Sequence, residues 1–164
     1  MKTLILIRHA KSDWSNPFLH DFDRELNARG LKDAPMMGAV LYHKNIHPDL
    51  ILSSPAQRAQ ATAVAIAHKL SFPEDAITYN SALYESDIET VFAVIRSVPD
   101  TCKTLILFGH NPEMTECVNA LCDADIDNIP TCGVVAMRLR GDSWKNIEYH
   151  SAELLFFDKP KQHR

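Results

Sequence analysis

The 164-residue sequence lacks the basic excess that is typical of nucleic-acid-binding proteins. Its 17 Lys and Arg residues are outnumbered by 21 Asp and Glu residues, which gives a net charge of −4. Nucleic-acid-binding domains usually carry a basic face, so this balance argues against that class. The short basic stretch "KPKQHR", residues 159–164, is interpreted as a solvated tail, with a weak interaction arm as the alternative.

The sequence also lacks a long hydrophobic run. No segment approaches the roughly 18 apolar residues of a membrane span. The beginning of the chain, "MKTLILIRHAK", has one Lys before a short apolar run and no small-residue cleavage site, so it does not resemble a signal peptide. We therefore expect a cytoplasmic protein that does not contact a membrane.

Closely spaced cysteines are absent. Cys102, Cys117, Cys122 and Cys132 form no C-x-x-C pair, which argues against a redox motif and a zinc knuckle. The chain has eight His residues, but no His/Cys spacing is typical of a metal site. We expect neither a metal nor another cofactor.

The length of the chain suits one domain, and the sequence contains no repeat, low-complexity segment or long linker. We therefore predict one α/β domain over residues 1–164. Apolar runs alternate with segments of helical period, which is typical of α/β folds. The predicted strands are 2–8, 49–53, 76–79 and 104–108, and the predicted helices are 28–44, 55–70, 87–98 and 112–122. Beyond them, "TCGVVAMRLR" and "KNIEYHSAELLFF" flank the turn signal "GDSW" and predict a closing antiparallel hairpin.

Local signals indicate where two of these helices begin. In "SSPAQ", Ser54 is predicted to be an N-cap that forms a capping box with Gln57, and the proline between them suits the first helical position. In "HNPE", Asn111 is predicted to cap the helix and Glu113 to complement its dipole. Pro35 lies inside the first predicted helix, where proline costs about 3 kcal/mol. Either that helix kinks, or it starts just before Pro35.

Polar side chains follow each predicted parallel strand. Arg8 and His9 come at the end of the first strand, Arg58 lies just beyond the second, Glu85 follows the third and His110 follows the fourth. The carboxyl ends of the strands share one edge of an open α/β sheet, and ligands bind there. The sequence therefore predicts that these side chains converge.

Two Arg and two His side chains suit the chemistry of phosphate. Arg guanidinium groups pair with phosphate oxygens through two hydrogen bonds, and a neutral imidazole can attack phosphorus. Phosphoryl transfer depends mainly on positioning and charge stabilisation, so this set suffices without a metal. Each residue also has a structural alternative: Arg8 as an ion-pair partner of Asp21 or Asp23, Arg58 as a solvated residue, and His110 as a cap or core residue.

Several motifs carry a family resemblance. "LIRHAKS", "SSPAQRAQATA" and "GHNP" resemble the histidine phosphatase superfamily, which includes phosphoglycerate mutases and acid phosphatases. "RHAKSDW", "DFDRELNARG", "ALYES", "GHNPEM" and "TCGVVAMRL" are most similar to the SixA-type phosphohistidine phosphatases. The resemblance covers nearly the whole chain. It implies a phosphoglycerate mutase-like fold, a three-layer α/β/α sandwich with a mostly parallel central sheet and a C-terminal antiparallel hairpin.

The resemblance also implies roles for individual residues. His9 is expected to be the nucleophile that is transiently phosphorylated, and Arg8, Arg58 and His110 are expected to bind the phosphoryl group. Lys11 and Ser12 are placed at the rim of the pocket, where Ser12 is expected to contact substrate.

Two departures from the family pattern bear on this site. Ala10 stands where much of the superfamily has Gly, so the turn survives only if it needs no positive φ. "DRELNARG" lacks a proline that often follows the Arg in relatives, and we expect Arg24 to be structural.

The proton donor is open at this stage. Larger members of the superfamily protonate an alkoxide leaving group with a carboxylic acid. Glu85 is the candidate by position, with Asp21 and Asp23 as alternatives, and a solvated loop acid or helix cap as the structural interpretation of Glu85. An imidazole leaves more easily than an alkoxide, so a phosphohistidine phosphatase does not need this acid.

The segment 13–24 contains three aromatic residues near the expected pocket. Trp14, Phe18 and Phe22 either form a platform for a protein surface or anchor the loop to the core, and we favour the anchor.

The sequence leaves three functional hypotheses. The first is a metal-independent phosphatase that dephosphorylates protein phosphohistidine, such as that of a histidine-containing transfer domain in a phosphorelay. The second is a phosphatase for small phosphomonoesters or sugar phosphates. The third is a phosphate-binding module without turnover.

Overall fold

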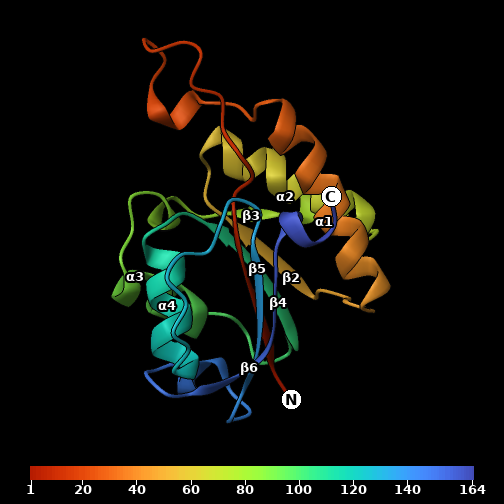
Figure 1. Cartoon of the computed structure of the whole chain (residues 1–164). Helices are drawn as coiled ribbons and strands as arrows, with labels where there is room; N and C mark the ends of the chain where they lie inside the picture. Colours follow the sequence, from red (N-terminus) through yellow and green to blue (C-terminus); the bar gives the residue numbers. More distant parts are fainter.

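The computed structural model describes residues 1–164, which form a six-stranded sheet with helices on both faces (Figure 1). The strand order is β3-β2-β4-β1-β5-β6. The strands are β1 (Thr3–Arg8), β2 (Leu50–Ser53), β3 (Thr78–Tyr79), β4 (Thr104–Gly109), β5 (Val134–Leu139) and β6 (Ala152–Asp158). The helices are α1 (Ala28–His43), α2 (Gln57–Lys69), α3 (Ile88–Arg96) and α4 (Glu113–Cys122). None of the helices combines the length and apolar character that crossing a membrane requires.

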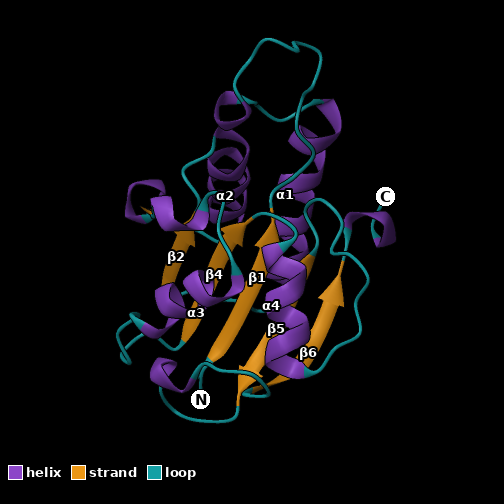
Figure 2. Ribbon diagram, turned by 90° about the vertical axis from the view of Figure 1, so that its left-hand side faces the viewer, coloured by secondary structure: helices purple, strands orange, loops and turns teal.

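The central strands are apolar on both faces because helices cover both faces of the sheet. In β1, Leu4 and Leu6 pack in the core beneath α3 and α4, whereas Ile5 and Ile7 pack in the core beneath α1 and α2. All four side chains are fully buried. Alternate residues of a strand point to opposite faces, so the run "LILI" supplies two cores at once. This confirms the three-layer α/β/α architecture (Figure 2).

The register of the sheet brings the predicted polar residues to one edge. β1 and β4 are parallel neighbours, and Arg8 lies opposite Gly109. β2 is parallel to β4, with Ser53 opposite Phe108. His9, Ser54 and His110 therefore leave the sheet at the same level.

The C-terminal antiparallel pair is confirmed, but its connection is not a tight turn. β5 pairs with β6, which begins only at Ala152 rather than in the segment from 145. The reason is Trp144, which is fully buried and donates its indole N–H to the carbonyl of Cys102 at 2.8 Å. The Asp100 carboxylate accepts from the Trp144 backbone N–H at 2.9 Å and fixes the turn there. A buried indole with satisfied hydrogen bonds thus takes the place of strand pairing.

The first helix runs through Pro35. Asn27 caps α1, and its side-chain oxygen accepts from the Gly30 N–H at 2.9 Å. This cap fixes the start of the helix one turn after the 13–24 loop. The alternative of a later start near Pro35 is therefore wrong.

The predicted capping box of α2 is also wrong. The helix begins at Gln57 after Ala56, and no side chain caps it. Ser54 instead accepts from the Ala56 N–H at 3.2 Å in a local turn. The prediction that Asn111 is the N-cap of α4 is off by one residue, because the helix begins at Glu113 and Pro112 occupies the cap position. The Asn111 side chain still accepts from the Thr115 N–H at 3.3 Å.

The loop 13–24 projects from the carboxyl edge of the sheet (Figures 1 and 2). Arg24 is buried beneath it and donates to the carbonyls of Asn16 and Leu19, both at 3.1 Å. Its guanidinium also stacks on the Trp14 ring, with its carbon 3.8 Å from the ring centroid. These contacts agree with a structural role for Arg24. Anchoring to the core is wrong for two of the aromatic residues, because Trp14 is 62% exposed and Phe18 93% exposed.

Candidate active site

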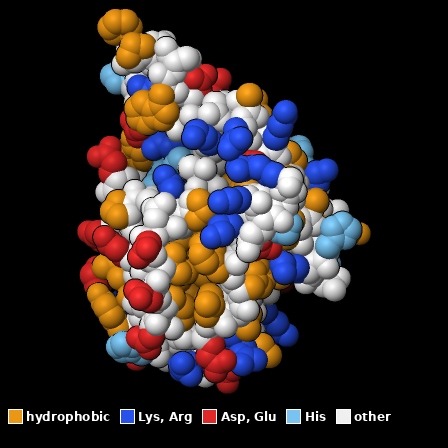
Figure 3. Space-filling view, viewed as in Figure 1, with side chains coloured by type: hydrophobic (Ala, Val, Ile, Leu, Met, Phe, Trp, Pro, Cys, Tyr) orange, Lys and Arg blue, Asp and Glu red, His pale blue; other side chains and the backbone are white.

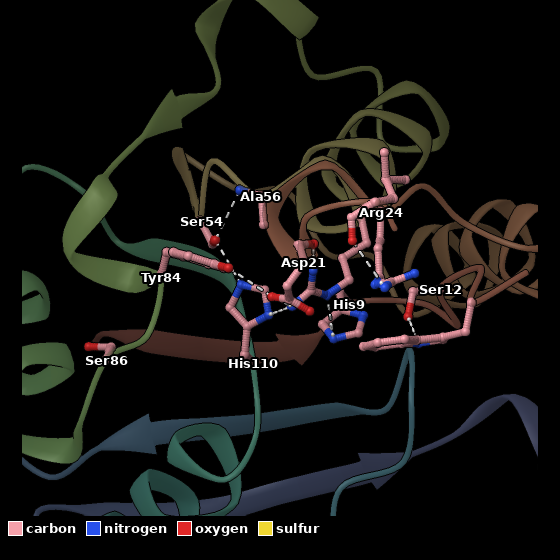
Figure 4. Close-up of polar contacts among 12 residues, drawn as sticks. His9, Ser12, Asp21, Arg24, Ser54, Ala56, Tyr84, Ser86 and His110 are labelled. Carbon is pink, nitrogen blue, oxygen red and sulfur yellow. Dashed lines mark hydrogen bonds and ion pairs between the residues drawn. The ribbon is translucent and has the colours of Figure 1, made fainter. Parts of the chain in front are cut away.

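The predicted His and Arg residues meet at the carboxyl edge of the sheet (Figure 4). His9 follows β1, Arg58 lies in the first turn of α2, and His110 follows β4. The Arg58 Nε lies 3.3 Å from His9 Nε2, and its Nη2 lies 3.4 Å from His110 Nδ1. The two imidazole centroids are 5.1 Å apart. Arg58 thus bridges two histidines that are 101 positions apart in the sequence.

The His9 imidazole has a defined tautomer. Its Nδ1–H donates to the carbonyl of Ala10 at 2.7 Å, which leaves the lone pair on Nε2. Burial lowers the pKa of His9 to about 3, so the ring is neutral at pH 7. Ala10 is buried without a positive φ, and its N–H donates to Thr62 at 2.9 Å. The missing Gly therefore does not disturb this turn.

His110 is oriented from both sides of its ring. Because Arg58 can only donate, His110 Nδ1 accepts, and its Nε2–H donates to the Ser54 hydroxyl at 2.8 Å. Burial and the nearby Arg58 charge lower the pKa of His110 to about 4. Ser54, which the sequence suggested as a helix cap, thus holds His110 in place. Because Ser54 directly follows β2, its place at the carboxyl edge of the sheet could have indicated a contact with His110.

We expect both imidazoles to remain neutral from about pH 8 to 5. NMR titration of the ring nitrogens should show no protonation of His9 or His110 in this window, whereas in the denatured chain both should titrate near the ordinary pKa of about 6.5. Since the folded-state pKa values are depressed, the unfolded chain binds more protons as the pH falls through 6.5. Acidification from pH 7 towards 4 should therefore lower the free energy of unfolding. A titration midpoint near 6.5 for either ring in the folded protein would contradict this description of the site.

A carboxylate and a phenol hold the other side of Arg58. Asp21 accepts from Arg58 Nη2 at 3.0 Å and from the Tyr84 hydroxyl at 2.8 Å. Burial acts to raise the pKa of Asp21, but the hydrogen bonds from Tyr84 and Arg58 outweigh it and the pKa is lowered. Burial and the bond to Asp21 raise the pKa of Tyr84 to about 12. Asp21 therefore pairs with Arg58 rather than Arg8, and an ionised carboxylate with two donors is poorly suited to donate a proton.

On one side of the histidines lies a cavity of about 360 Å³, called here the His9 cavity. Arg8 lines it and donates through Nη1 to the Ile129 carbonyl at 2.9 Å, while its buried Nε has no partner in the chain. Lys11 and Ser12 also line this cavity. The Ser12 hydroxyl, however, accepts from the Trp14 indole at 2.9 Å and is almost fully buried.

On the other side lies a cavity of about 390 Å³, called here the acidic cavity. Asp21, Glu85 and Glu113 line it together with His110 and Tyr84. Glu85 is exposed and has a φ of 50°, whereas Glu113 is only 4% exposed and accepts from the Ser86 N–H at 3.3 Å.

Burial raises the pKa of Glu113. From the sequence, Glu113 was interpreted only through the helix dipole, although its place next to "GHNP" was a signal for this site. Asp23 is exposed and lines neither cavity.

No three His, Cys, Asp or Glu side chains of the chain lie together in a way that could hold a metal ion. The site consists of two Arg side chains, Arg8 and Arg58, two neutral imidazoles and the carboxyl groups of the acidic cavity.

Comparison with known proteins places the chain in a family. The model of the Histidine phosphatase superfamily (branch 1) matches residues 4–92. An uncharacterized protein of Mycobacterium leprae is 30% identical over 94% of this chain and 100% of its own length. An Agrobacterium tumefaciens crystal structure, provisionally described as the phosphohistidine phosphatase SixA, is 28% identical, with a TM-score of 0.83 over 97% of this chain and 98% of its own.

A second solved structure has the same fold at lower identity. The protein histidine phosphatase SixA complexed with tungstate superposes with a TM-score of 0.84 at 18% identity, over 99% of both chains. Together with the matched family model, these likenesses cover the sheet and both helical layers. The chain belongs to the histidine phosphatase superfamily (branch 1).

Proposed function

We propose that this chain, acting as one domain over residues 1–164, is a phosphatase that forms a covalent phosphohistidine on His9. Its proposed substrate is a phosphohistidine on another protein, such as a histidine-containing transfer domain. The observation that carries the proposal is the neutral His9 ring, with its lone pair on Nε2, in a cavity that is also lined by Arg8 and Arg58. Membership of the superfamily and the likeness to SixA structures support it.

The first proposed step transfers the phosphoryl group to His9. The group enters the His9 cavity, where Arg8, Lys11 and Arg58 offset its charge. Arg58 exchanges its long 3.3 Å contact with Nε2 for the phosphoryl oxygens. The Nε2 lone pair forms a bond to phosphorus as the bond to the leaving group breaks. The Ala10 carbonyl, which accepts from Nδ1–H, stabilises the positive charge that develops on the ring.

The second step returns the enzyme to its starting state. Water attacks phosphorus, the P–N bond to His9 breaks, and inorganic phosphate leaves. We expect Arg58, which lines the His9 cavity, and His110, which lies beside Arg58, to bind the phosphoryl group in both steps. The contact with Ser54 keeps His110 from rotating away. Because these groups are already held by the fold, little reorganisation is needed at the transition state.

The acidic cavity contains the proposed proton donor, which matters for some leaving groups and not for others. A buried carboxyl with a raised pKa is suited to donate a proton, which favours Glu113 over the exposed Glu85. We expect Glu113→Gln to slow hydrolysis of alkyl phosphates by about 10²-fold, because an alkoxide must be protonated to leave. Hydrolysis of phosphohistidine should change by less than about threefold, because imidazole leaves readily.

Glu85→Gln is the matched control for this prediction, since Glu85 lines the same cavity. Steady-state rates on a phosphohistidine protein, an alkyl phosphate and an aryl phosphate give the comparison. A larger loss for Glu85→Gln would assign the proton donor to Glu85. Equal losses on all three substrates would show that neither carboxyl protonates the leaving group.

The proposed function is tested by phosphate release in the presence of a chelator. The wild type and His9→Ala are compared on a phosphohistidine-bearing transfer domain and on a generic aryl phosphate. We expect His9-dependent release with a strong preference for the phosphohistidine protein. Faster release from the ester would identify a small-molecule phosphatase instead, and binding of phosphate without release from either would identify a recognition module.

A further inference from the structure

The His9 cavity adjoins two further cavities that are lined by cations. Thr131 lines the His9 cavity and also a neighbouring cavity of about 320 Å³, which contains Lys159, Lys161 and Arg164. Arg164 in turn lines a third cavity, of about 380 Å³, together with Arg29 and Lys32 of α1. Because each neighbouring pair shares a lining residue, the three cavities lie side by side along this face. We call the two cavities beyond Thr131 the basic groove.

The basic groove carries an unbalanced positive charge. Asp33 is the only acidic side chain in its lining; it is 3% exposed and forms an ion pair with Arg164 at 2.8 Å. The cations that line the groove or the adjoining rim are Lys11, Arg29, Lys32, Lys159, Lys161 and Arg164. Lys and Arg side chains gather across this face beneath the projecting loop, while acidic side chains lie to one side (Figure 3). In a chain of net charge −4, this is a marked separation of charge.

The cations at the end of the chain are held by the fold. Residues 161–164 are exposed to solvent, as predicted, but the segment 159–164 is not a free tail. Pro160–Gln162 form a short 3₁₀ turn in which Pro160 is buried. His163 bonds to Asp158 at 2.7 Å on the strand side, and Arg164 bonds to Asp33 of α1. These contacts position Lys159 and Lys161 over the groove, where a mobile tail would spread their charge over many conformations.

We propose that the basic groove binds acidic side chains of a protein substrate that flank its phosphorylated residue. This inference rests on the proposed phosphatase function and names the chemistry of its partner. The cations extend over two cavities beyond the one that holds His9, so a substrate confined to the His9 cavity does not reach them. The exposed Trp14, which lines the His9 cavity, and Phe18 add apolar contacts of the kind that protein surfaces use.

A protein partner fits this face better than a nucleic acid. The negative net charge of the chain and the carboxyl groups of the acidic cavity repel a long uniform polyanion. A folded protein with a local acidic patch can place that patch against the basic groove and keep it away from the acidic cavity. Such charge pairing at the rim of an interface increases the association rate and orients the partner.

The experiment uses charge reversal in the groove. The variant Lys159→Glu/Lys161→Glu is compared with Lys103→Glu/Lys145→Glu, which changes the net charge equally at the opposite end of the strands. The probes are two peptides with the same phosphohistidine, one flanked by Asp and Glu and the other by Ser and Gly, and an aryl phosphate that occupies only the His9 cavity.

We expect the groove variant to lower kcat/KM for the acidic peptide about tenfold, through KM, with the difference disappearing at high salt. Its rates on the neutral peptide and the aryl phosphate should stay within about twofold of wild type, which also shows that the variant is folded. Equal losses on both peptides, or the same loss in the control variant, would overturn the proposal. Stronger competition by single-stranded DNA than by an acidic peptide without phosphate would overturn it in favour of a nucleic acid.

A binding measurement separates the groove from the chemistry. His9→Ala, with and without the groove substitutions, is titrated with the acidic peptide lacking phosphate. If the wild type releases no phosphate from any probe but this affinity still falls with charge reversal, the proposed function fails and the groove stands. If phosphate is released and the affinity does not change, the groove proposal fails and the function stands.

Discussion

His9→Ala should abolish phosphate release, with kcat/KM lower by at least ~10⁴-fold, because removal of a covalent nucleophile leaves no alternative group at the reacting position. The nearby His110 cannot substitute, because its Nε2–H is engaged by Ser54 and its Nδ1 faces Arg58. The fold should persist, since the His9 side chain bonds only to the Ala10 carbonyl and Arg58. The measurement is phosphate release from a phosphohistidine protein, with a thermal melt of each variant.

The matched control for this variant is His47→Ala, which removes an exposed imidazole that forms no side-chain hydrogen bond. It should keep the full rate. Retention by His9→Ala of more than a few per cent of the wild-type rate, with the melt unchanged, would remove His9 from the role of nucleophile.

Arg58→Ala should have the second largest effect, a loss of about 10²- to 10³-fold in kcat, because its guanidinium is aimed at the position where charge develops. It is the one side chain that contacts His9, His110 and Asp21 together. Arg58→Lys should recover only part of the rate, because an ammonium lacks the planar fork that pairs with two oxygens. Single-turnover kinetics under saturating substrate measure the effect on the chemical step.

Tyr84→Phe is the control for the Arg58 substitutions, because Tyr84 and Arg58 both donate to Asp21. It removes the hydroxyl on Asp21 but leaves the Arg58–Asp21 ion pair, so we expect a loss below about tenfold. An unchanged kcat in Arg58→Ala would show that Arg58 holds the 13–24 loop through Asp21 and does not act on the phosphoryl group.

The α/β class could be predicted from the periodicity of the sequence, whereas the order of the strands in the sheet could not. The alternation of apolar runs such as "LILI" in β1 with segments of helical period predicted strands and helices in turn. The four parallel strands and the antiparallel end of the sheet then placed His9 and His110 at one edge. Trp144 was not predictable in this way, because its burial depends on a distant carbonyl of Cys102.

The candidate site was predictable in its cations and imidazoles but not in their partners. Asp21 reaches Arg58 only because the 13–24 loop folds back over α2, and no local pattern encodes that return. Ser54 carries a strong capping signal, but the demand of a buried imidazole for an acceptor takes precedence. Glu113 was visible as an acid in a first helical turn, whereas its burial beside Ser86 is a tertiary property.

The most direct test of the account is to trap the phosphorylated enzyme. Wild-type protein is mixed with a phosphohistidine substrate, quenched in alkali within one turnover, digested and mapped by mass spectrometry. We expect one phosphoryl group on the His9 peptide, which is acid-labile and forms before free phosphate accumulates. Release of phosphate with no label on His9, or with the label on another residue such as Ser12 or His110, would contradict it.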